Sequence, residues 1–159
     1  MTKTIKRRRQ EGKTDYKARL ALLKSSEPRL IIRRTNRYVI AQFVQSKVAQ
    51  DSIIFGANSK DLLEMGWPSE FAGSLKSRAA AYLTGLLLGS KAKSKIKSAI
   101  LDMGLHRNIA KSRIYSVLKG VIDSGIKIAH SEEVLPSEED LNSNEKLNSI
   151  FQKLKEKIK

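Results

Sequence analysis

Two apolar runs separated by a short polar turn stand out in the first third of the chain. They cover residues 30–32 and 38–44, and the turn at residues 35–37 contains Asn36, which tolerates the left-handed backbone of a tight hairpin. Each run carries apolar residues on both faces, which is typical of strands covered on both sides. The pattern therefore predicts two paired strands in the centre of a sheet. After a polar link at residues 45–51, residues 52–57 are expected to form a third strand.

Further along the chain, the apolar period changes from that of a strand to that of a helix. The buried face of the expected helix consists of Leu75, Ala79, Tyr82, Leu83, Leu86 and Leu87. Gly89 is expected to end this helix, because glycine is the residue most often found just beyond a helix C-terminus. A short apolar run at residues 98–103 then predicts a fourth strand.

A second helix is expected between a cap at Ser112 and a stop at Gly125. Its buried face consists of Ile114, Val117, Leu118, Val121 and Ile122. The element order is β-β-β-α-β-α, which predicts an α/β fold, a sandwich with helices packed on a mixed sheet. A strand reached through a helix lies parallel to its neighbour in the sheet, so the strand at 98–103 is expected to be parallel.

Residues 1–28 are predicted to be a basic arm outside the globular domain. It contains one short helix, Tyr16–Leu23, capped by Thr14 or Asp15, and Leu20 and Leu23 are expected to contact the body.

The C-terminal part combines an acidic stretch with a final helix. The apolar face of that helix consists of Leu147, Ile150, Phe151, Leu154 and Ile158. Two interpretations stay open, since the helix either packs on its own domain or lies on another protein. The expected organisation is an arm at 1–28, a globular α/β domain at 29–130, and an acidic stretch with a C-terminal helix at 131–159.

Composition narrows the class of protein. The hydrophobic fraction of 40% is that of a folded domain. The absence of cysteine excludes a disulfide framework, a thiolate metal site and a cysteine nucleophile. The N-terminus has no apolar segment of a secretory signal, and no apolar run approaches the roughly 18 residues of a membrane span. A soluble cytoplasmic protein without contact to membranes is expected.

Charge is distributed very unevenly. Residues 1–38 hold 13 Lys and Arg against 3 acidic residues, whereas the whole chain has a net charge of +15. This excess of positive charge within a short segment predicts a polyanionic partner. Arginine predominates in the clusters, and its planar guanidinium binds phosphate and stacks on bases, which favours RNA.

The candidate RNA-binding residues lie in the arm, in the hairpin and after the fourth strand. In the hairpin, Arg29, Arg33, Arg34 and Arg37 are expected to project from a rigid scaffold. Tyr16 and Tyr38 flank the basic clusters and either stack on unpaired bases or are half-buried aromatic residues.

Catalysis is the alternative function. His106, Arg107 and Lys111 resemble the acid–base groups of a small basic ribonuclease or an RNA-modifying enzyme, although an RNA contact at the carboxyl end of a strand fits His106 and Arg107 better. A non-specific DNA-binding protein is a third possibility. His106 and His130 have no nearby ligand pattern, so no metal is expected, and no phosphate-binding glycine loop is present. No cofactor is expected.

Six blocks of residues resemble one known family. In order, they read RRRxEGKTDYxARLxLLKS, PRLIIRRTNRYVIAQ, AAYLTGLLLG, AILDMGLHR, SRIYSVLKGVIDSGI and HSEEVLP, covering residues 6 to about 140. They are similar to the archaeal branch of the large-subunit ribosomal protein family L eighteen, whose eukaryotic relative is called L five. The link at residues 56–74 fits the family loosely, and it leaves Trp67 without a role.

The resemblance implies a protein of the central protuberance that joins 5S rRNA to the large-subunit rRNA. Its expected partners are these two RNAs and neighbouring large-subunit ribosomal proteins, and an obligate homo-oligomer is not expected. The RNA-binding residues are expected to be Arg7, Arg8, Arg9, Lys13, Thr14, Tyr16, Arg19, Arg29, Arg33, Arg34, Thr35, Asn36, Arg37, His106, Arg107 and Arg113.

Overall fold

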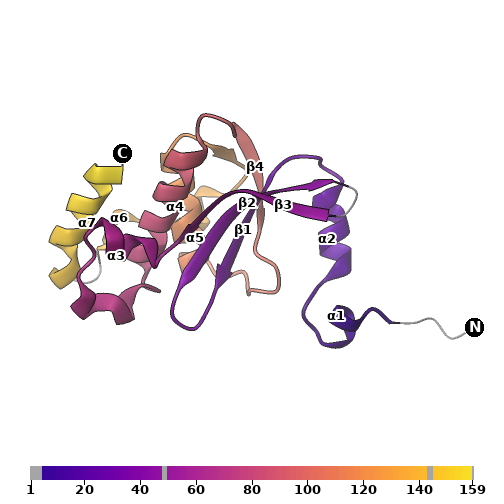
Figure 1. Ribbon diagram of the computed structural model, residues 1–159, viewed down its shortest axis with the longest axis horizontal. Helices are drawn as coiled ribbons and strands as arrows, with labels where there is room; N and C mark the ends of the chain where they lie inside the picture. The colour runs from indigo at the N-terminus through magenta and orange to yellow at the C-terminus, as the bar shows by residue number, and fades with distance from the viewer. Residues whose placement is uncertain (1–4, 48–49, 143–144, 159) are drawn as a thin grey trace, which may run out of the picture.

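The hairpin predicted from the two apolar runs is at the centre of the fold in the computed structural model, which describes residues 5–47, 50–142 and 145–158 (Figure 1). Strands β1 (Arg29–Arg34) and β2 (Val39–Lys47) pair in antiparallel register, with Arg34 opposite Val39. The backbone N–H of Thr35 donates to the carbonyl of Tyr38 at 2.9 Å, and the Tyr38 N–H donates to the Thr35 hydroxyl at 2.9 Å. These two hydrogen bonds hold the tip of the hairpin in one conformation.

Three further strands complete the sheet: β3 (Gln50–Asn58), β4 (Ser98–Asp102) and β5 (Lys127–Ile128). The strand order is β3-β2-β1-β4-β5, and β1 is antiparallel to β2 but parallel to β4. The predicted α/β fold with a mixed sheet is therefore confirmed, as is the parallel strand reached through a helix. The two-residue strand β5 was not predicted, because two residues are too few to show a period.

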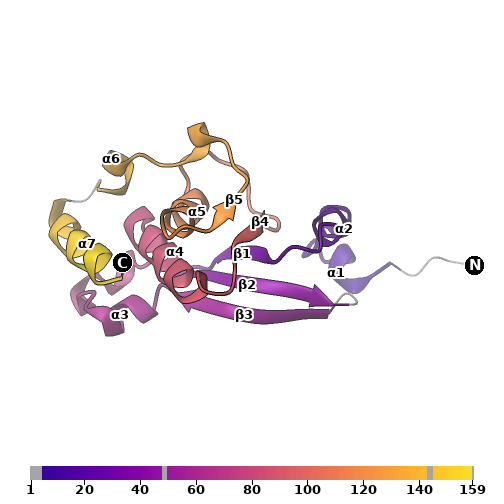
Figure 2. The ribbon, with the colours of Figure 1, turned by 90° about the horizontal axis from the view of Figure 1, so that it is seen from above.

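The helices are α1 (Arg7–Gln10), α2 (Tyr16–Leu23), α3 (Asp61–Met65), α4 (Arg78–Ala92), α5 (Arg113–Asp123), α6 (Glu138–Leu141) and α7 (Glu145–Ile158), with 3₁₀ helices η1 (Ser69–Ser74) and η2 (Glu132–Val134). Helices α4 and α5 pack on each other and on the sheet, and α7 packs on α4 (Figure 2). The arm with α1 and α2 lies at one end of the molecule and α7 at the other (Figure 1).

Close contact between α4 and α5 depends on glycine. A Cβ atom at Gly85 would lie 2.1 Å from the carbonyl oxygen of Val117, and one at Gly120 would lie 2.2 Å from that of Tyr82. Gly89 serves the same contact, since a Cβ there would lie 2.0 Å from the Ser124 hydroxyl. The prediction that Gly89 ends the helix is therefore wrong.

Three other local predictions also differ from the structure. Leu75 is buried but precedes α4, which Ser77 caps. Most of the expected link at 45–51 is strand in β2 and β3, with Lys47 paired to Gln50. The prediction failed because this stretch is exposed, so its polar sequence resembles that of a loop. Leu20 was expected to contact the body, but it is 59% exposed, and α2 has no buried residue.

Strand β3 forms one edge of the sheet and is exposed over much of its length. It pairs with β2 alone in the described part of the chain, and its apolar side chains Ile53 and Ile54 are 60% and 36% exposed.

The C-terminal helix packs on its own domain. Leu147, Phe151 and Leu154 are buried, and the Phe151 ring centroid lies 5.6 Å from that of Tyr82 in α4. Of the two interpretations left open, the packing on its own domain is the one the structure shows.

The acidic stretch forms η2 and α6 and contacts basic residues of the same chain. Asp140 pairs with Arg78 and with Lys111, each at 3.3 Å. Trp67 is a core residue in the loosely matching link, where its indole N–H donates to the Phe71 carbonyl at 3.1 Å.

Candidate nucleic-acid interface

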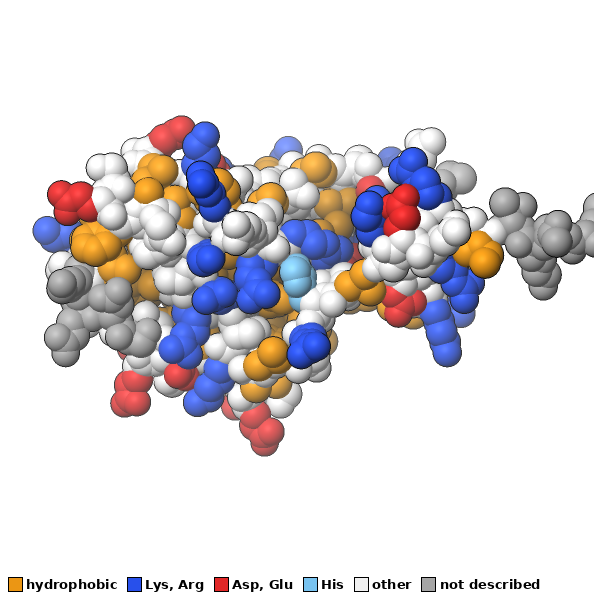
Figure 3. Space-filling view, turned by 90° about the horizontal axis from the view of Figure 1, so that it is seen from below, with side chains coloured by type: hydrophobic (Ala, Val, Ile, Leu, Met, Phe, Trp, Pro, Cys, Tyr) orange, Lys and Arg blue, Asp and Glu red, His pale blue; other side chains and the backbone are white. Residues whose placement is uncertain are grey.

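Basic side chains gather on the face of the molecule that Figure 3 shows. Figure 3 shows a group of Lys and Arg side chains in the middle of this face, next to a histidine, while the Asp and Glu side chains on it lie around the group. Such a surface attracts polyanions. Two recesses lie among the predicted basic residues, one beside the arm and one at the tip of the β1–β2 hairpin.

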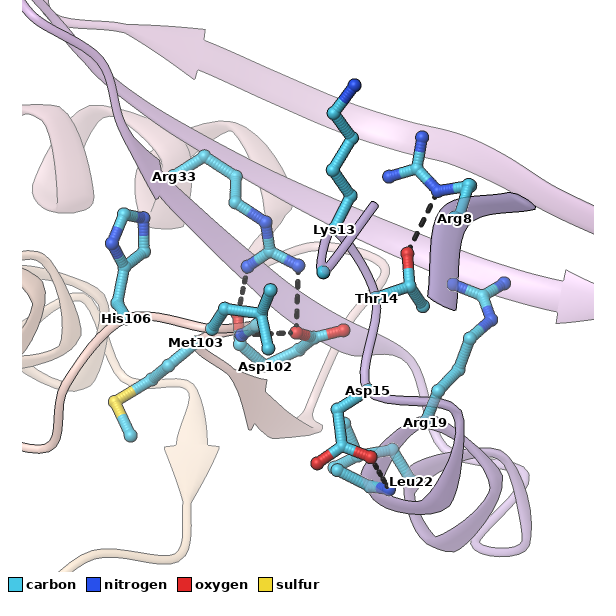
Figure 4. A pocket seen from close by; sticks show the side chains of 14 residues that line it. Arg8, Lys13, Thr14, Asp15, Arg19, Leu22, Arg33, Asp102, Met103 and His106 are labelled. Atoms are coloured by element: carbon cyan, nitrogen blue, oxygen red, sulfur yellow. Dashed lines mark hydrogen bonds and ion pairs between the residues drawn. The ribbon is translucent and has the colours of Figure 1, made fainter. Parts of the chain in front are cut away.

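The first recess is a cleft of about 620 Å³ between the arm and the loop after β4, which we call the arm cleft (Figure 4). Four cationic side chains line it: Arg8, Lys13, Arg19 and Arg33. They come from α1, the turn before α2, α2 itself and β1. Segments far apart in the sequence thus present positive charge to a single space.

Arg29 lies beneath this surface and does not project from it. It is 1% exposed, and its guanidinium donates to Asp102 at 2.7 Å, to Ser46 at 2.9 Å and to Asp51 at 2.7 Å. The prediction that Arg29 is presented to RNA is therefore wrong. The sequence is misleading here because Arg29 and Arg33 share one face of β1. Only long-range partners from β2, β3 and β4 bury Arg29, while 40% of the Arg33 side chain stays exposed.

Asp51 connects the sheet to the arm. It accepts from Arg29 and, at 2.8 Å, from Arg19 of α2. Burial raises the pKa of Asp51, but the hydrogen bonds from Ser46, Arg19 and Arg29 outweigh that effect and hold this pKa below its ordinary value. The carboxylate is therefore ionised at neutral pH, and it fixes α2 to β3.

Arg33 is held in place at the floor of the arm cleft. Its guanidinium donates to the backbone carbonyl of Asp102 at 2.8 Å and to the Asp102 carboxylate at 2.9 Å, and 40% of the side chain stays exposed. Gly104 has a φ of +61° and lies against this guanidinium, where a Cβ would be 2.8 Å from Cζ of Arg33. A rigid, half-exposed guanidinium of this kind is suited to binding a phosphate.

His106 faces the same cleft as a neutral acceptor. Its Nε2 accepts a hydrogen bond of 3.2 Å from the backbone N–H of Arg34. Burial lowers the pKa of His106, and the charges of Arg33 and Arg34 lower it further. Because Nε2 is occupied, it is not free to accept a substrate proton, and Lys111 is paired with Asp140. The arrangement does not favour the ribonuclease alternative.

The second recess, which we call the tip pocket, has a volume of about 380 Å³. Arg34, Thr35, Asn36, Lys76 and Arg113 line it. Four of these were predicted from the sequence, and Lys76 was missed. No basic run surrounds Lys76 in the sequence, and only the fold brings it to the hairpin.

The predicted RNA-binding residues therefore fall into four groups. The arm cleft brings together Arg8, Lys13, Thr14, Arg19, Arg33 and His106. The tip pocket brings together Arg34, Thr35, Asn36 and Arg113. Neither recess is lined by Arg7, Arg9, Tyr16, Arg37 or Arg107. Arg29 is inside the protein.

Tyr16 and Tyr38 are both half-buried. Lys6 lies over the Tyr16 ring at 4.5 Å from its centroid, so one face of this ring already has a cationic neighbour.

Within the described residues, no group of three His, Cys, Asp or Glu side chains is placed to hold a metal ion. No helix in the same part of the chain is long and apolar enough to span a membrane.

Comparison with known proteins gives a consistent result. The chain matches the family described as "Ribosomal large subunit proteins 60S L5, and 50S L18" over residues 2–99 and 90–131. It is 49% identical over 151 residues to large ribosomal subunit protein uL18 of Korarchaeum cryptofilum, covering 94% of this chain and 75% of the relative. The protein of the same name from Aeropyrum pernix is 43% identical over 135 residues, which are 84% of this chain and 61% of the relative. The protein of this name from Methanococcus maripaludis is 45% identical over 137 residues, which are 86% of this chain and 69% of the relative.

Proposed function

The chain belongs to the family of large ribosomal subunit proteins 60S L5 and 50S L18, and we propose that it binds 5S rRNA and helps attach it to the large-subunit rRNA in the central protuberance. Family membership makes it a structural protein of the large ribosomal subunit rather than an enzyme. Neighbouring large-subunit proteins are its further expected partners. The chain covers between 61% and 75% of the length of the three relatives described above.

The observation that supports RNA binding best is the arm cleft. Arg8, Lys13 and Arg19 of the arm face Arg33 of the sheet across one space, so a single backbone segment of RNA can contact both. Neutralising phosphates releases counterions, and this release contributes a large share of the affinity. The ionised network beneath the cleft fixes Arg33 and Arg19 in advance, which reduces the entropy lost on binding.

Recognition of 5S rRNA in this proposal depends on shape and on unpaired bases. The major groove of an RNA duplex is too deep and narrow for side chains to read, so loops and the phosphate backbone are the accessible features. The hairpin with Arg34, Thr35 and Asn36 is rigid enough to enter such a loop.

A binding titration with labelled 5S rRNA tests the proposal. Replacing Arg7, Arg8 and Arg9 together by Gln should weaken binding strongly and reduce the slope of log affinity against log salt by about 0.7–0.9 for each lost phosphate contact. The matched control replaces the exposed Lys91, Lys93 and Lys153 by Gln, which removes the same charge elsewhere.

Equal affinity of the two triple variants would contradict the proposal. Equal affinity of the wild type for 5S rRNA and for duplex DNA at physiological salt would favour a non-specific DNA-binding protein.

A further inference from the structure

Three basic residues in the tip pocket have no acidic partner in the described part of the chain. Arg34 ends β1, Lys76 immediately precedes the cap of α4, and Arg113 is the first residue of α5. None of them forms an ion pair with any described acidic side chain. The fold thus gathers three like charges from three separate segments of the chain, and no described acidic side chain pairs with them.

Burial makes this arrangement more costly. Lys76 and Arg113 are half-buried, so their charges are partly withdrawn from water as well as close to each other. A partly desolvated cation without a partner is unfavourable, and a bound anion removes that penalty.

Neighbouring cations show that the chain compensates positive charge nearby. Arg78 lies two residues after Lys76 in the sequence, and Lys111 lies two residues before Arg113. Both Arg78 and Lys111 pair with Asp140. The acidic stretch therefore neutralises these two and leaves Lys76 and Arg113 unpaired. Because Asp140 is already shared by two cations, this carboxylate is not the natural partner of the tip pocket.

The pocket also offers a neutral donor on a rigid hairpin. Asn36 lines it beside Thr35, whose hydroxyl and backbone N–H both donate to the Tyr38 carbonyl and so hold the hairpin tip in place. The Arg34 backbone is held from the other side by His106. Helix α5 begins at Arg113 without a side-chain hydrogen bond from its cap, Ser112, so the positive end of this helix adds to the field of the three cations.

We propose that the tip pocket is a second RNA phosphate site, separate from the arm cleft, in which Lys76 acts with Arg34 and Arg113 on the sugar–phosphate backbone. This inference rests on the proposed RNA-binding function and adds Lys76 as a contact residue. Arg34 and Arg113 bind the phosphate through planar guanidinium groups, and Lys76 contributes a point charge.

Lys76→Gln and Lys153→Gln form a matched pair of variants for the test. Both remove one positive charge, but Lys153 is an exposed residue on α7, at the opposite end of the molecule from the arm. In titrations with 5S rRNA, Lys76→Gln should weaken binding about tenfold at physiological salt. It should also reduce the salt slope by about 0.7–0.9. Lys153→Gln should leave both close to wild type.

The outcomes separate this inference from the proposed function. If the wild type binds 5S rRNA and the two variants bind equally, the phosphate site is overturned while the proposed function stands. If the wild type does not bind 5S rRNA, the proposed function fails, and an oligouridylate titrated into the isotope-labelled protein decides about the pocket. Shifts of the Thr35, Asn36, Lys76 and Arg113 amide signals support the site, and their absence overturns it.

Discussion

The Arg29 guanidinium donates a 2.7 Å hydrogen bond to the Asp102 carboxylate, and only 2% and 8% of these side chains are exposed. A buried ion pair adds little stability compared with an apolar pair, but removing one partner leaves the other charged and desolvated. Arg29 also binds Asp51, so it is the common donor of two carboxylates. Its role is to supply the positive charge that both carboxylates contact beneath the arm cleft.

Replacing Arg29 by Met is expected to lower the free energy of unfolding by about 3–5 kcal/mol, because Asp51 and Asp102 lose their shared donor. Urea denaturation measures this change. Arg37→Met is the matched control: Arg37 is exposed in the same hairpin, and its loss should change stability by no more than about 0.5 kcal/mol. Equal destabilisation by both variants would show that the buried network is not what stabilises this region.

Replacing Gly85 by Ala should destabilise the contact between α4 and α5. The new methyl group would lie 2.1 Å from a backbone carbonyl, so the two helices must move apart at a cost of about 1–3 kcal/mol or more. Gly73→Ala is the control, since a Cβ at Gly73 has no neighbour within 4 Å. Thermal unfolding of both variants measures the difference, and similar midpoints would argue against the close helix contact.

Stability is expected to fall as the pH is lowered through about 6.5, because the pKa of His106 lies below its ordinary value of 6.5 in the folded protein. Between the two values the unfolded chain binds more protons, so protonation favours unfolding there, and the full contribution is present above pH 6.5. His106→Gln should make this part of the pH profile flatter. Urea denaturation at pH 7.5, 6.5 and 5.5 tests it, and an unchanged profile in the variant would rule out His106 as the cause.

Arg19→Gln is expected to loosen α2 without unfolding the domain. The Arg19–Asp51 pair is about 30% exposed on both sides, so its loss should change the free energy of unfolding by less than about 1 kcal/mol. Hydrogen exchange of the α2 amides should nevertheless become faster, because α2 has no buried residue that would hold it otherwise. Lys17→Gln, at an exposed position of the same helix, should leave the exchange rates unchanged; faster exchange there too would remove the special role of Arg19.

The elements with a clear apolar period were predictable from the sequence. Two short apolar runs around a polar turn identified the β1–β2 hairpin, and apolar residues at helical spacing identified α5. Helix α4 was found but its ends were misplaced, because it is buried nearly all round and so shows no polar face to mark its limits. The described residues at 45–51, where β2 and β3 pair, were taken for a link because they are polar and mostly exposed.

The candidate site was predictable only as a set of basic residues. Charge density in the sequence identifies Arg8, Arg33 and Arg34 equally with Arg29, yet partners from β2, β3 and β4 bury the last of these. Lys76 shows the converse, since it stands alone in the sequence and reaches the hairpin only through the fold. Which cations are free and which are compensated depends on long-range contacts that no local pattern records.

The exposed edge of β3 affects how the protein behaves in solution. An open strand edge with Ile53 at its surface favours pairing between copies, and a net charge of +15 keeps those copies apart. Bound RNA neutralises this charge, so turbidity is expected to peak where the charges of protein and RNA balance. Purification therefore works best far from that point, with either no RNA or an excess of it.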